Sequence, residues 1–266
     1  MLYHSVNGVQ TNQVSISDRG FAYGDGFFTT AKISQGIIEF QQAHLERLIK
    51  ASETLSIAPI NFQQLNRDIT ALASAYSLAV LKIVITAGEG GRGYARSPLL
   101  APTIVLSVFE FPAHYSRLQK EGINLGIAQT QLGLNPLLAG IKHLNRLEQV
   151  VVRAELGRSG FDDLVVCDLN NHIIETSSAN LFWKIGNNWF TSTLAQAGVN
   201  GVIRQQLLRL FPDIVAIDAP VSVLNEASAM CVCNSIMGIV PVHTFMERKL
   251  IDESQFLLQR LGKHSE

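Results

Sequence analysis

The spacing of hydrophobic and polar residues along the first part of the chain predicts strands and two helices. Asn7-Gly8 is typical of a tight hairpin turn near the start. Alternating or continuous apolar runs predict strands, and apolar residues at helical spacing predict helices. The predicted strands are Phe27–Ile33, Ile37–Phe40, Val80–Ala87 and Thr103–Phe111, and the predicted helices are Ala43–Leu55 and Phe62–Tyr76. Pro59 separates the two helices, and Pro112 ends the last strand.

The second part of the chain again mixes strands with helices. The predicted strands are Ile123–Ala128, Asp163–Cys167, Ile173–Glu175, Leu181–Ile185, Ile214–Ile217 and Ala229–Cys233, and the predicted helices are His143–Leu156, Val202–Leu210 and Glu253–Leu261. We therefore predict a mixed α/β (α+β) protein. Its length of 266 residues favours two domains, a smaller one over residues 1–113 and a larger one over residues 114–266.

The composition adds an expectation about assembly. Hydrophobic residues make up 47% of the chain and charged residues only 16%. Soluble domains carry roughly 25% charged residues. A surface this poor in charge favours a homodimer, in which a second subunit covers apolar side chains.

Charge and cysteine content exclude several classes of protein. The net charge is −1 with no basic run, which argues against nucleic-acid binding. The most apolar stretch, Ala79–Ala87, is short and carries Lys82, so we expect no membrane span. The first residues show neither the basic nor the apolar region of a secretory leader, so we expect a cytoplasmic protein. Cys167, Cys231 and Cys233 form no CxxC pair, so neither a structural zinc site nor a disulfide framework is expected. Because the charge pattern argues against nucleic acid, we expect the partner to be a small molecule.

The segment Gly88–Gly93 matches the glycine pattern of dinucleotide-binding sites and follows a predicted strand. Such a site also needs a helix that opens at the last glycine. Pro98 and Pro102 follow too closely for a regular helix. A surface loop is therefore favoured over an NAD-dependent oxidoreductase, and Arg92 and Tyr94 give this loop groups that can bind an anion.

Four other positions carry groups that could take part in catalysis or bind a cofactor. Lys142 is flanked by apolar residues, where desolvation favours the neutral amine that Schiff-base chemistry requires. Glu175 ends a short strand, and a carboxylate there could hold the ring nitrogen of a pyridoxal cofactor. The helix that starts at Val202 offers amides for a phosphate, and Arg47 could clamp one. Taken in isolation, Glu175 is more often an exposed strand-end carboxylate and Arg47 a solvated helix residue.

Longer segments resemble a known family, the fold-type IV pyridoxal-phosphate enzymes, which include D-amino-acid and branched-chain aminotransferases and aminodeoxychorismate lyases. The segments that carry the resemblance are Asp18–Thr30, His44–Leu48, Gly140–Glu148, Glu175 with Ala179–Trp183, and Gly198–Gln205. Their order and spacing agree with the family over about Asp18 to Val242. The resemblance implies the two-domain fold of the D-amino-acid and branched-chain aminotransferases, with the lysine in the larger domain.

Within this family, three segments make the chain most similar to the bacterial aminodeoxychorismate lyases: Gly90–Tyr94, Phe111–Tyr115 and Gly140–Glu148. This resemblance implies elimination of pyruvate from 4-amino-4-deoxychorismate to give 4-aminobenzoate, a step of folate biosynthesis. The implied cofactor is pyridoxal 5'-phosphate, bound covalently by Lys142. The other cofactor contacts implied are the ring-nitrogen partner Glu175 and the phosphate-binding groups Arg47, Val202, Ile203 and Ser235.

The substrate-binding residues that the resemblance implies are Arg92, Tyr94 and Phe28, and Thr30 is expected to assist the leaving group. D-amino-acid transaminases carry histidine at the position of Tyr94 and commonly tyrosine at that of Phe28, which argues against plain transamination. A D-amino-acid or branched-chain aminotransferase of the same fold stays open, as does secondary transaminase activity. A ligand-binding module without enzymatic activity is a further alternative.

Overall fold

The computed structural model describes residues 1–262, and these divide into two compact units. The first unit comprises Met1–Phe111 together with the short segment Lys142–Asn145. Of the described residues, the second comprises Pro112–Ile141 and residues 146–262. Lys142, which the family resemblance implies in the larger domain, is grouped with the first unit. Backbone hydrogen bonds explain this grouping, because Phe28 N–H donates to Lys142 O at 2.9 Å and Leu144 N–H donates to Gly26 O at 3.0 Å.

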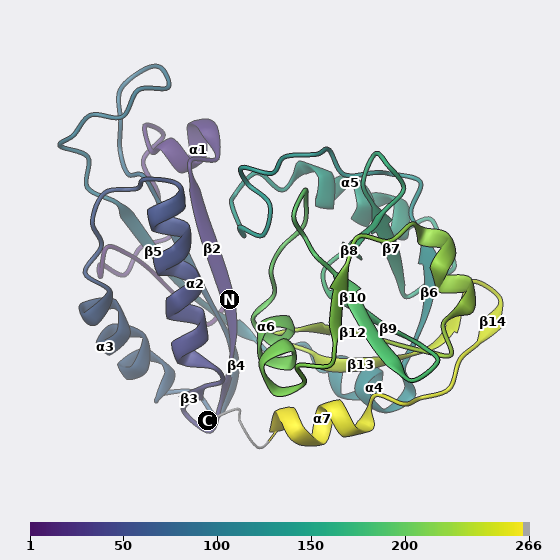
Figure 1. Cartoon of the computed structure of the whole chain (residues 1–266). Coiled ribbons are helices and arrows are strands. Elements are labelled where there is room, and N and C mark those ends of the chain that lie inside the picture. Colours follow the sequence, from purple (N-terminus) through teal and green to yellow (C-terminus); the bar gives the residue numbers. More distant parts are fainter. Residues whose placement is uncertain (263–266) are drawn as a thin grey trace. The chain divides into compact units, whose positions relative to one another are not determined.

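The first unit contains an antiparallel five-stranded sheet in the order β1-β5-β4-β2-β3. Its elements are β1 (Tyr3–Val6), α1 (Arg19–Tyr23), β2 (Gly26–Ser34), β3 (Ile37–Ile38), α2 (Gln41–Thr54), α3 (Phe62–Ala73), β4 (Leu78–Thr86) and β5 (Thr103–Glu110). Figure 1 shows α2 and α3 lying along this sheet, with α2 packed on β2 and α3 on β3. The helices therefore cover one sheet face.

Buried and half-buried side chains alternate along β2, and this alternation explains how the sheet is built. Phe27, Ala31 and Ile33 are buried, whereas Phe28 and Thr30 on the opposite face are only half-buried. Successive side chains of a strand point to opposite faces, so one apolar row packs under the helices and the other row is available for chemistry. The same period places Leu81, Ile83 and Ile85 of β4 in the core.

The second unit contains a mixed nine-stranded sheet with the order β11-β10-β9-β12-β13-β6-β7-β8, and β14 pairs with β13. Its elements are α4 (Tyr115–Glu121), β6 (Ile123–Ile127), α5 (Leu147–Leu156), β7 (Asp163–Cys167), β8 (Ile173–Thr176), β9 (Asn180–Ile185), β10 (Asn188–Ser192), α6 (Val202–Leu210), β11 (Val215–Ile217), the 3-10 helix η1 (Val221–Glu226), β12 (Ala229–Asn234), β13 (Gly238–Phe245), β14 (Arg248–Lys249) and α7 (Gln255–Gly262). The β10–β11, β13–β6 and β6–β7 pairs are parallel.

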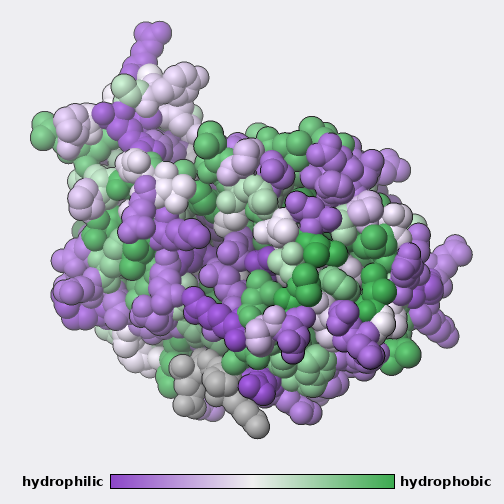
Figure 2. Space-filling model, in the orientation of Figure 1, coloured by the Kyte–Doolittle hydropathy of each residue, from purple (hydrophilic) through white to green (hydrophobic). Residues whose placement is uncertain are grey.

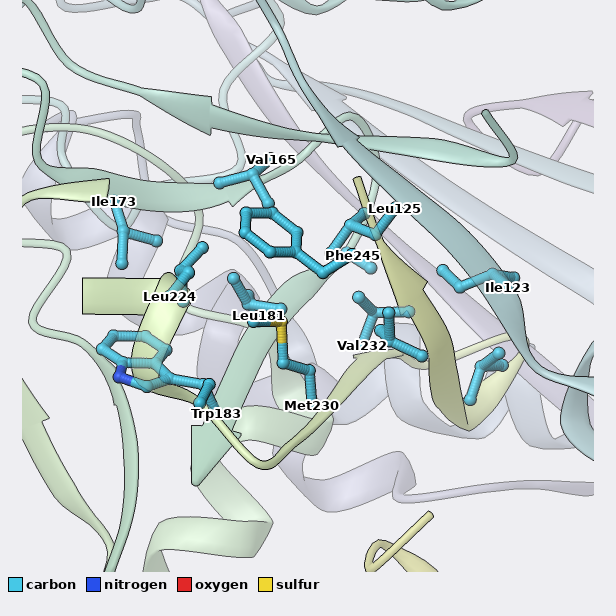
Figure 3. Close-up of a cluster of buried hydrophobic side chains, with 14 of the residues drawn as sticks. Ile123, Leu125, Val165, Ile173, Leu181, Trp183, Leu224, Met230, Val232 and Phe245 are labelled. Carbon is cyan, nitrogen blue, oxygen red and sulfur yellow. The ribbon is translucent and has the colours of Figure 1, made fainter. Parts of the chain in front are cut away.

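Strand β7 is buried on both faces, and this explains its continuous apolar sequence. Val165 packs in a cluster that includes Trp183, Met230 and Phe245, shown in Figure 3. Leu164 faces the other way and packs in a cluster of buried residues that includes α5 side chains. The sheet of this unit is thus covered on both sides where β7 runs.

All three cysteines are free and buried in the second unit. Burial raises the pKa of the Cys167 thiol to about 11 and that of Cys233 to about 12, and it raises the pKa of Cys231 well above its usual value. Cys231 and Cys233 share one face of β12, as their spacing predicted. These thiols are core residues.

Several boundaries differ from the sequence predictions. The helix expected from His143 begins only at Leu147, because residues 142–145 pair with β2 instead. The strand expected to reach Phe40 ends at Ile38, and Phe40 adopts a left-handed conformation as the N-cap of α2. The last helix starts at Gln255, since Asp252 and Ser254 form a turn before it. Its predicted end, Leu261, lies within the observed helix.

Candidate active site

Lys142 lies over the aromatic ring of Phe28. Its Nζ is 4.7 Å from the ring centroid, and the two residues are also joined through the backbone hydrogen bond from Phe28 to Lys142. The ring shields one side of the amine from water. This is the partly desolvated setting in which a lysine amine serves as a nucleophile or a base.

Lys82, a residue that the sequence analysis did not single out, shares that ring. Its Nζ is 5.1 Å from the centroid of Phe28, and on the sheet it pairs with Thr30. Within the described chain, Lys82 forms no salt bridge or hydrogen bond. The available signal was a charge in the middle of an otherwise apolar strand.

Thr30 lies on the same face of β2 as Phe28 and is half-buried. The sheet register therefore groups four predicted or newly found residues in the first unit: Lys142, Phe28, Thr30 and Lys82. A hydroxyl and two amines around one aromatic ring can bind an anionic ligand and exchange protons with it.

Arg47 and His44 come from α2, one turn apart. Burial lowers the pKa of the Arg47 guanidinium to about 10. Burial, together with the charge of Arg47, lowers the pKa of His44 to about 3, so this imidazole is neutral. His44 Nδ1 and Thr29 Oγ1 share a hydrogen bond of 2.6 Å. The neutral histidine adds no positive charge beside Arg47, which leaves the guanidinium as the cation of this helix turn.

Glu175 is the third residue of β8, next to its last residue Thr176, and it is a buried carboxylate with 6% of its surface exposed. Val199 N–H donates to its Oε2 at 3.0 Å. Gly198, with φ of +84°, permits this contact, because a Cβ there would lie 2.5 Å from Ile174 Cγ2. Burial lowers the pKa of the Arg146 guanidinium, and the charge of Glu175 partly offsets that effect. The carboxylate is thus fixed in place and interacts electrostatically with a cation in the same unit.

The N-terminus of α6 lies near Glu175, because Val199, which donates to Glu175, precedes the helix N-cap Gly201 by two residues. Gly201 is its N-cap, and no side chain caps the helix. Asn180 orders this turn, because its Oδ1 accepts from Gly201 N–H at 3.1 Å and its Nδ2 donates to Val199 O at 2.9 Å. Val202 and Ile203 are buried at the first turn. Uncapped amides at a helix N-terminus are suited to a phosphate group.

Ser235 follows β12 in a turn organised by Asn234. The Oδ1 of Asn234 accepts from the N–H groups of Ile236 and Met237, both at 2.9 Å. Ser235 is half-buried. It belongs to the same unit as Glu175 and α6.

Arg92 and Tyr94 lie on the loop of residues 87–102, which contains no helix, so the structure gives no support to a dinucleotide site there. Tyr94 is 88% exposed. Arg92 is also exposed, and its side chain forms no ion pair or hydrogen bond with residues 1–262. Both side chains are therefore accessible, and the structure does not bring them into contact with Phe28.

The site residues thus fall into two sets that the structure describes separately. Lys142, Phe28, Thr30, Arg47 and the loop residues belong to the first unit, and Glu175, Val202, Ile203 and Ser235 belong to the second. Among the described residues, no group of His, Cys, Asp and Glu side chains is arranged for a metal ion. No helix over residues 1–262 has the length and apolar character needed to cross a membrane.

The family model for amino-transferase class IV matches residues 26–245. An aminodeoxychorismate lyase of Vibrio harveyi is 39% identical over 241 residues, which cover 89% of each chain. The crystal structure of 4-amino-4-deoxychorismate lyase from Pseudomonas aeruginosa matches with a TM-score of 0.91 and 34% identity over 96% of each chain. The branched-chain amino acid aminotransferase of Escherichia coli shares the fold, with a TM-score of 0.86 and 17% identity over 97% of this chain and 92% of its own. The matched segment includes Phe28, Lys142 and Glu175, and the chain belongs to the amino-transferase class IV family.

Proposed function

We propose that this protein is a pyridoxal-phosphate-dependent lyase that converts 4-amino-4-deoxychorismate into 4-aminobenzoate and pyruvate. The observation that carries the proposal is the 39% identity to an aminodeoxychorismate lyase over 89% of both chains. The 34% identity to a second enzyme of that name supports it. The reaction supplies an aromatic amine for folate biosynthesis.

The donor groups of this chain fit pyridoxal phosphate. A lysine amine against an aromatic ring suits the aldehyde, and a buried carboxylate suits the ring nitrogen. An uncapped helix N-terminus and a half-buried guanidinium suit the phosphate. We assign these roles to Lys142, Glu175, the amides of Val202 and Ile203, and Arg47, with the Ser235 hydroxyl as a further phosphate donor. When bound, the cofactor supplies an electron-withdrawing ring that stabilises negative charge at the carbon next to a substrate amine.

Lys142 has the central role in proton transfer. Its neutral amine removes the proton from the ring carbon that bears the substrate's amino group. The bond between the neighbouring ring carbon and the enolpyruvyl oxygen then breaks, and the ring becomes aromatic. Lys142 returns a proton to the departing enolpyruvyl group, which leaves as pyruvate. The Glu175 carboxylate favours positive charge at the ring nitrogen.

The sheet face around Phe28 provides groups for the rest of the substrate. We assign to Thr30 a hydrogen bond to the enolpyruvyl oxygen as its bond breaks. Lys82 is an ammonium that no carboxylate of the described chain neutralises, so we assign it to a substrate carboxylate. Aminodeoxychorismate carries two carboxylates, and Arg92 with Tyr94 are candidates for the other.

Transamination is the second candidate function. A D-alanine aminotransferase of Bacillus licheniformis is 26% identical over 202 residues. Both reactions begin with removal of a proton beside the amine, so Lys142 serves either one. The two candidates differ in product: a transaminase makes an amino acid from a 2-oxo acid and an amino donor.

The decisive experiment is an assay of the purified holoenzyme with 4-amino-4-deoxychorismate. We expect 4-aminobenzoate and pyruvate in equal amounts, and none from Lys142→Ala. Borohydride treatment followed by peptide mapping should place the cofactor on Lys142. Amino-acid formation without 4-aminobenzoate would replace the lyase proposal by the transaminase, and an unmodified Lys142 would remove both.

We further propose that the protein is a homodimer acting in the cytoplasm. Leu147, Val150 and Val151 are 80%, 60% and 52% exposed along α5. Figure 2 shows hydrophobic residues at several places on the visible surface of the second unit. Exposed apolar patches of this kind mark interaction surfaces. Free cysteines without a disulfide support the cytoplasmic setting. Sedimentation of the protein at micromolar concentration tests the dimer, and a species of about 29 kDa alone would contradict it.

A further inference from the structure

Asp25 is the centre of a charged cluster in the first unit. Arg19 donates from Nε to Asp25 Oδ2 at 2.8 Å, and Arg96 donates from Nε to the same oxygen at 2.9 Å. A second bond joins Arg96 Nη2 to Asp25 Oδ1. The Arg19 side chain is 4% exposed and that of Asp25 is 11% exposed. One largely buried carboxylate thus orients two guanidinium groups, of which that of Arg19 is buried and that of Arg96 is partly exposed.

Both arginines direct their remaining N–H groups at backbone carbonyls. Arg19 donates to Gly93 O at 3.0 Å and to Tyr94 O at 2.9 Å. Arg96 donates to Leu55 O at 2.6 Å and to Ser56 O at 2.9 Å. The cluster therefore fastens the backbone that carries Tyr94 and joins the same loop to the residues that follow α2.

Tyr23 supports the same stretch of loop from α1. Its hydroxyl accepts from Gly93 N–H at 3.0 Å. Its ring lies 5.6 Å from the ring of Tyr94, and the Arg19 guanidinium is 4.9 Å from the Tyr23 ring centroid. The backbone of residues 93 and 94 is thus held at both N–H and C=O groups, while the side chains of Arg92 and Tyr94 stay exposed.

We infer that Asp25 is a positioning residue for substrate capture: through Arg19 and Arg96 it fixes the loop that presents Arg92 and Tyr94. The inference rests on the proposed function, in which those two side chains bind the substrate. The loop has no helix or strand of its own, so ordering it when substrate binds would cost conformational entropy. A loop ordered beforehand avoids that cost, which also explains why a buried charged cluster is retained there.

The test compares Asp25→Asn with Glu39→Gln as holoenzymes. Glu39 also pairs with a basic residue of the first unit, Lys32, at 2.7 Å, but it lies away from the loop. For Asp25→Asn we expect KM for aminodeoxychorismate to rise about tenfold, because the hydrogen bonds of both arginines to a charged carboxylate are weakened. We expect kcat to change less than about threefold, because the groups that carry out the reaction are unaltered. Glu39→Gln should match the parent enzyme in both constants. Asp25→Glu keeps a carboxylate, so its KM should lie between that of Asp25→Asn and that of the parent enzyme.

A second measurement reads the loop itself. Trypsin cleaves after an exposed arginine, and Arg92 precedes Gly93 in the fastened segment. Cleavage between these two residues should be about tenfold faster in Asp25→Asn than in the parent or in Glu39→Gln, at a temperature well below unfolding of each protein. If Asp25→Asn does not fold, the same measurements are made on Arg96→Gln, because the Arg96 side chain is 29% exposed.

Unchanged KM together with unchanged cleavage would overturn the positioning role, and so would a loss confined to kcat. Failure of the parent enzyme to form 4-aminobenzoate would refute the proposed function instead. The cleavage rates would then still decide whether Asp25 fastens the loop, so the two failures are distinguishable.

Discussion

Asn180 and Gly201 are in direct contact at the start of α6. The Oδ1 of Asn180 accepts from Gly201 N–H at 3.1 Å, and a Cβ built on Gly201 would lie 2.0 Å from that oxygen. No side chain at position 201 fits without displacing the amide. The residue that opens the proposed phosphate site is therefore fixed by its neighbour in β9.

The first prediction follows from this contact. Gly201→Ala should move Asn180 or the first turn of α6 and weaken binding of pyridoxal phosphate by about tenfold or more, because charge-assisted hydrogen bonds to the phosphate are lost. Titration of the apoenzyme followed by cofactor absorbance measures this. Gly160→Ala is the control, since a Cβ there meets nothing within 4 Å. Equal affinities in the two variants would contradict the phosphate assignment.

The second prediction concerns acid stability. The pKa of His44 is about 3 in the folded protein, below its ordinary value of 6.5, because of burial and the nearby Arg47 charge. Between these two pH values the His44 imidazole binds a proton in the unfolded chain but stays neutral in the folded chain. The stabilising effect is fully present above pH 6.5 and is lost as the pH falls towards 3, by about 1.4 kcal/mol per pH unit.

Denaturant unfolding between pH 7 and pH 4 checks this slope. In His44→Gln the contribution of this one proton should disappear, so its free energy of unfolding should decline less steeply with falling pH. The exposed His114 supplies the control, and His114→Gln should keep the parent slope. A parent-like slope in His44→Gln would show that the imidazole is not held neutral.

The third prediction concerns Lys82. Lys82→Met keeps most of the side-chain volume but removes the charge from the sheet face around Phe28. We expect KM for aminodeoxychorismate to rise about tenfold or more, because a hydrogen bond to a charged group contributes about 1.5–3 kcal/mol. Lys82→Arg should recover most of the affinity. Lys32→Met is the matched control, since Lys32 stands on the same face of β2 but is paired with Glu39.

The fourth prediction separates the chemical role of Glu175 from its structural one. In Glu175→Gln the amide oxygen can still accept from Val199 N–H, so the free energy of unfolding should change by less than about 1 kcal/mol. The charge that favours a protonated ring nitrogen is lost, and kcat should fall by about 10²- to 10³-fold. Steady-state kinetics and denaturant unfolding measure the two effects. A large loss of stability with normal kcat would assign Glu175 to the fold alone.

Local pattern was sufficient for much of the fold. The alternation in Phe27–Ile33 and the helical spacing in Phe62–Tyr76 correspond to β2 and α3, because each element buries one face against its neighbours. The roles of Lys142 and Glu175 are implied by the family resemblance of the segments that contain them. The fold and the family are confirmed by the comparisons, and the roles of the individual residues stay predictions.

Long-range contacts account for what the sequence did not show. Helical spacing around His143 predicted a helix, but hydrogen bonds to β2 hold residues 142–145 in an extended path. Lys82 looked like a mere interruption of an apolar stretch, and only the strand register places it beside Thr30. Asp25 and Arg96 are far apart in the chain, so no local pattern reveals their contact.

The distribution of cysteines has a practical consequence for unfolding experiments. All three thiols are buried in the second unit, and their raised pKa values keep them protonated and unreactive at neutral pH. A thiol reagent therefore labels the native chain only when that unit opens, and opening of the first unit gives no signal. The labelling rate therefore reports the opening of the second unit alone, and it can be measured in the unmodified protein without an engineered probe.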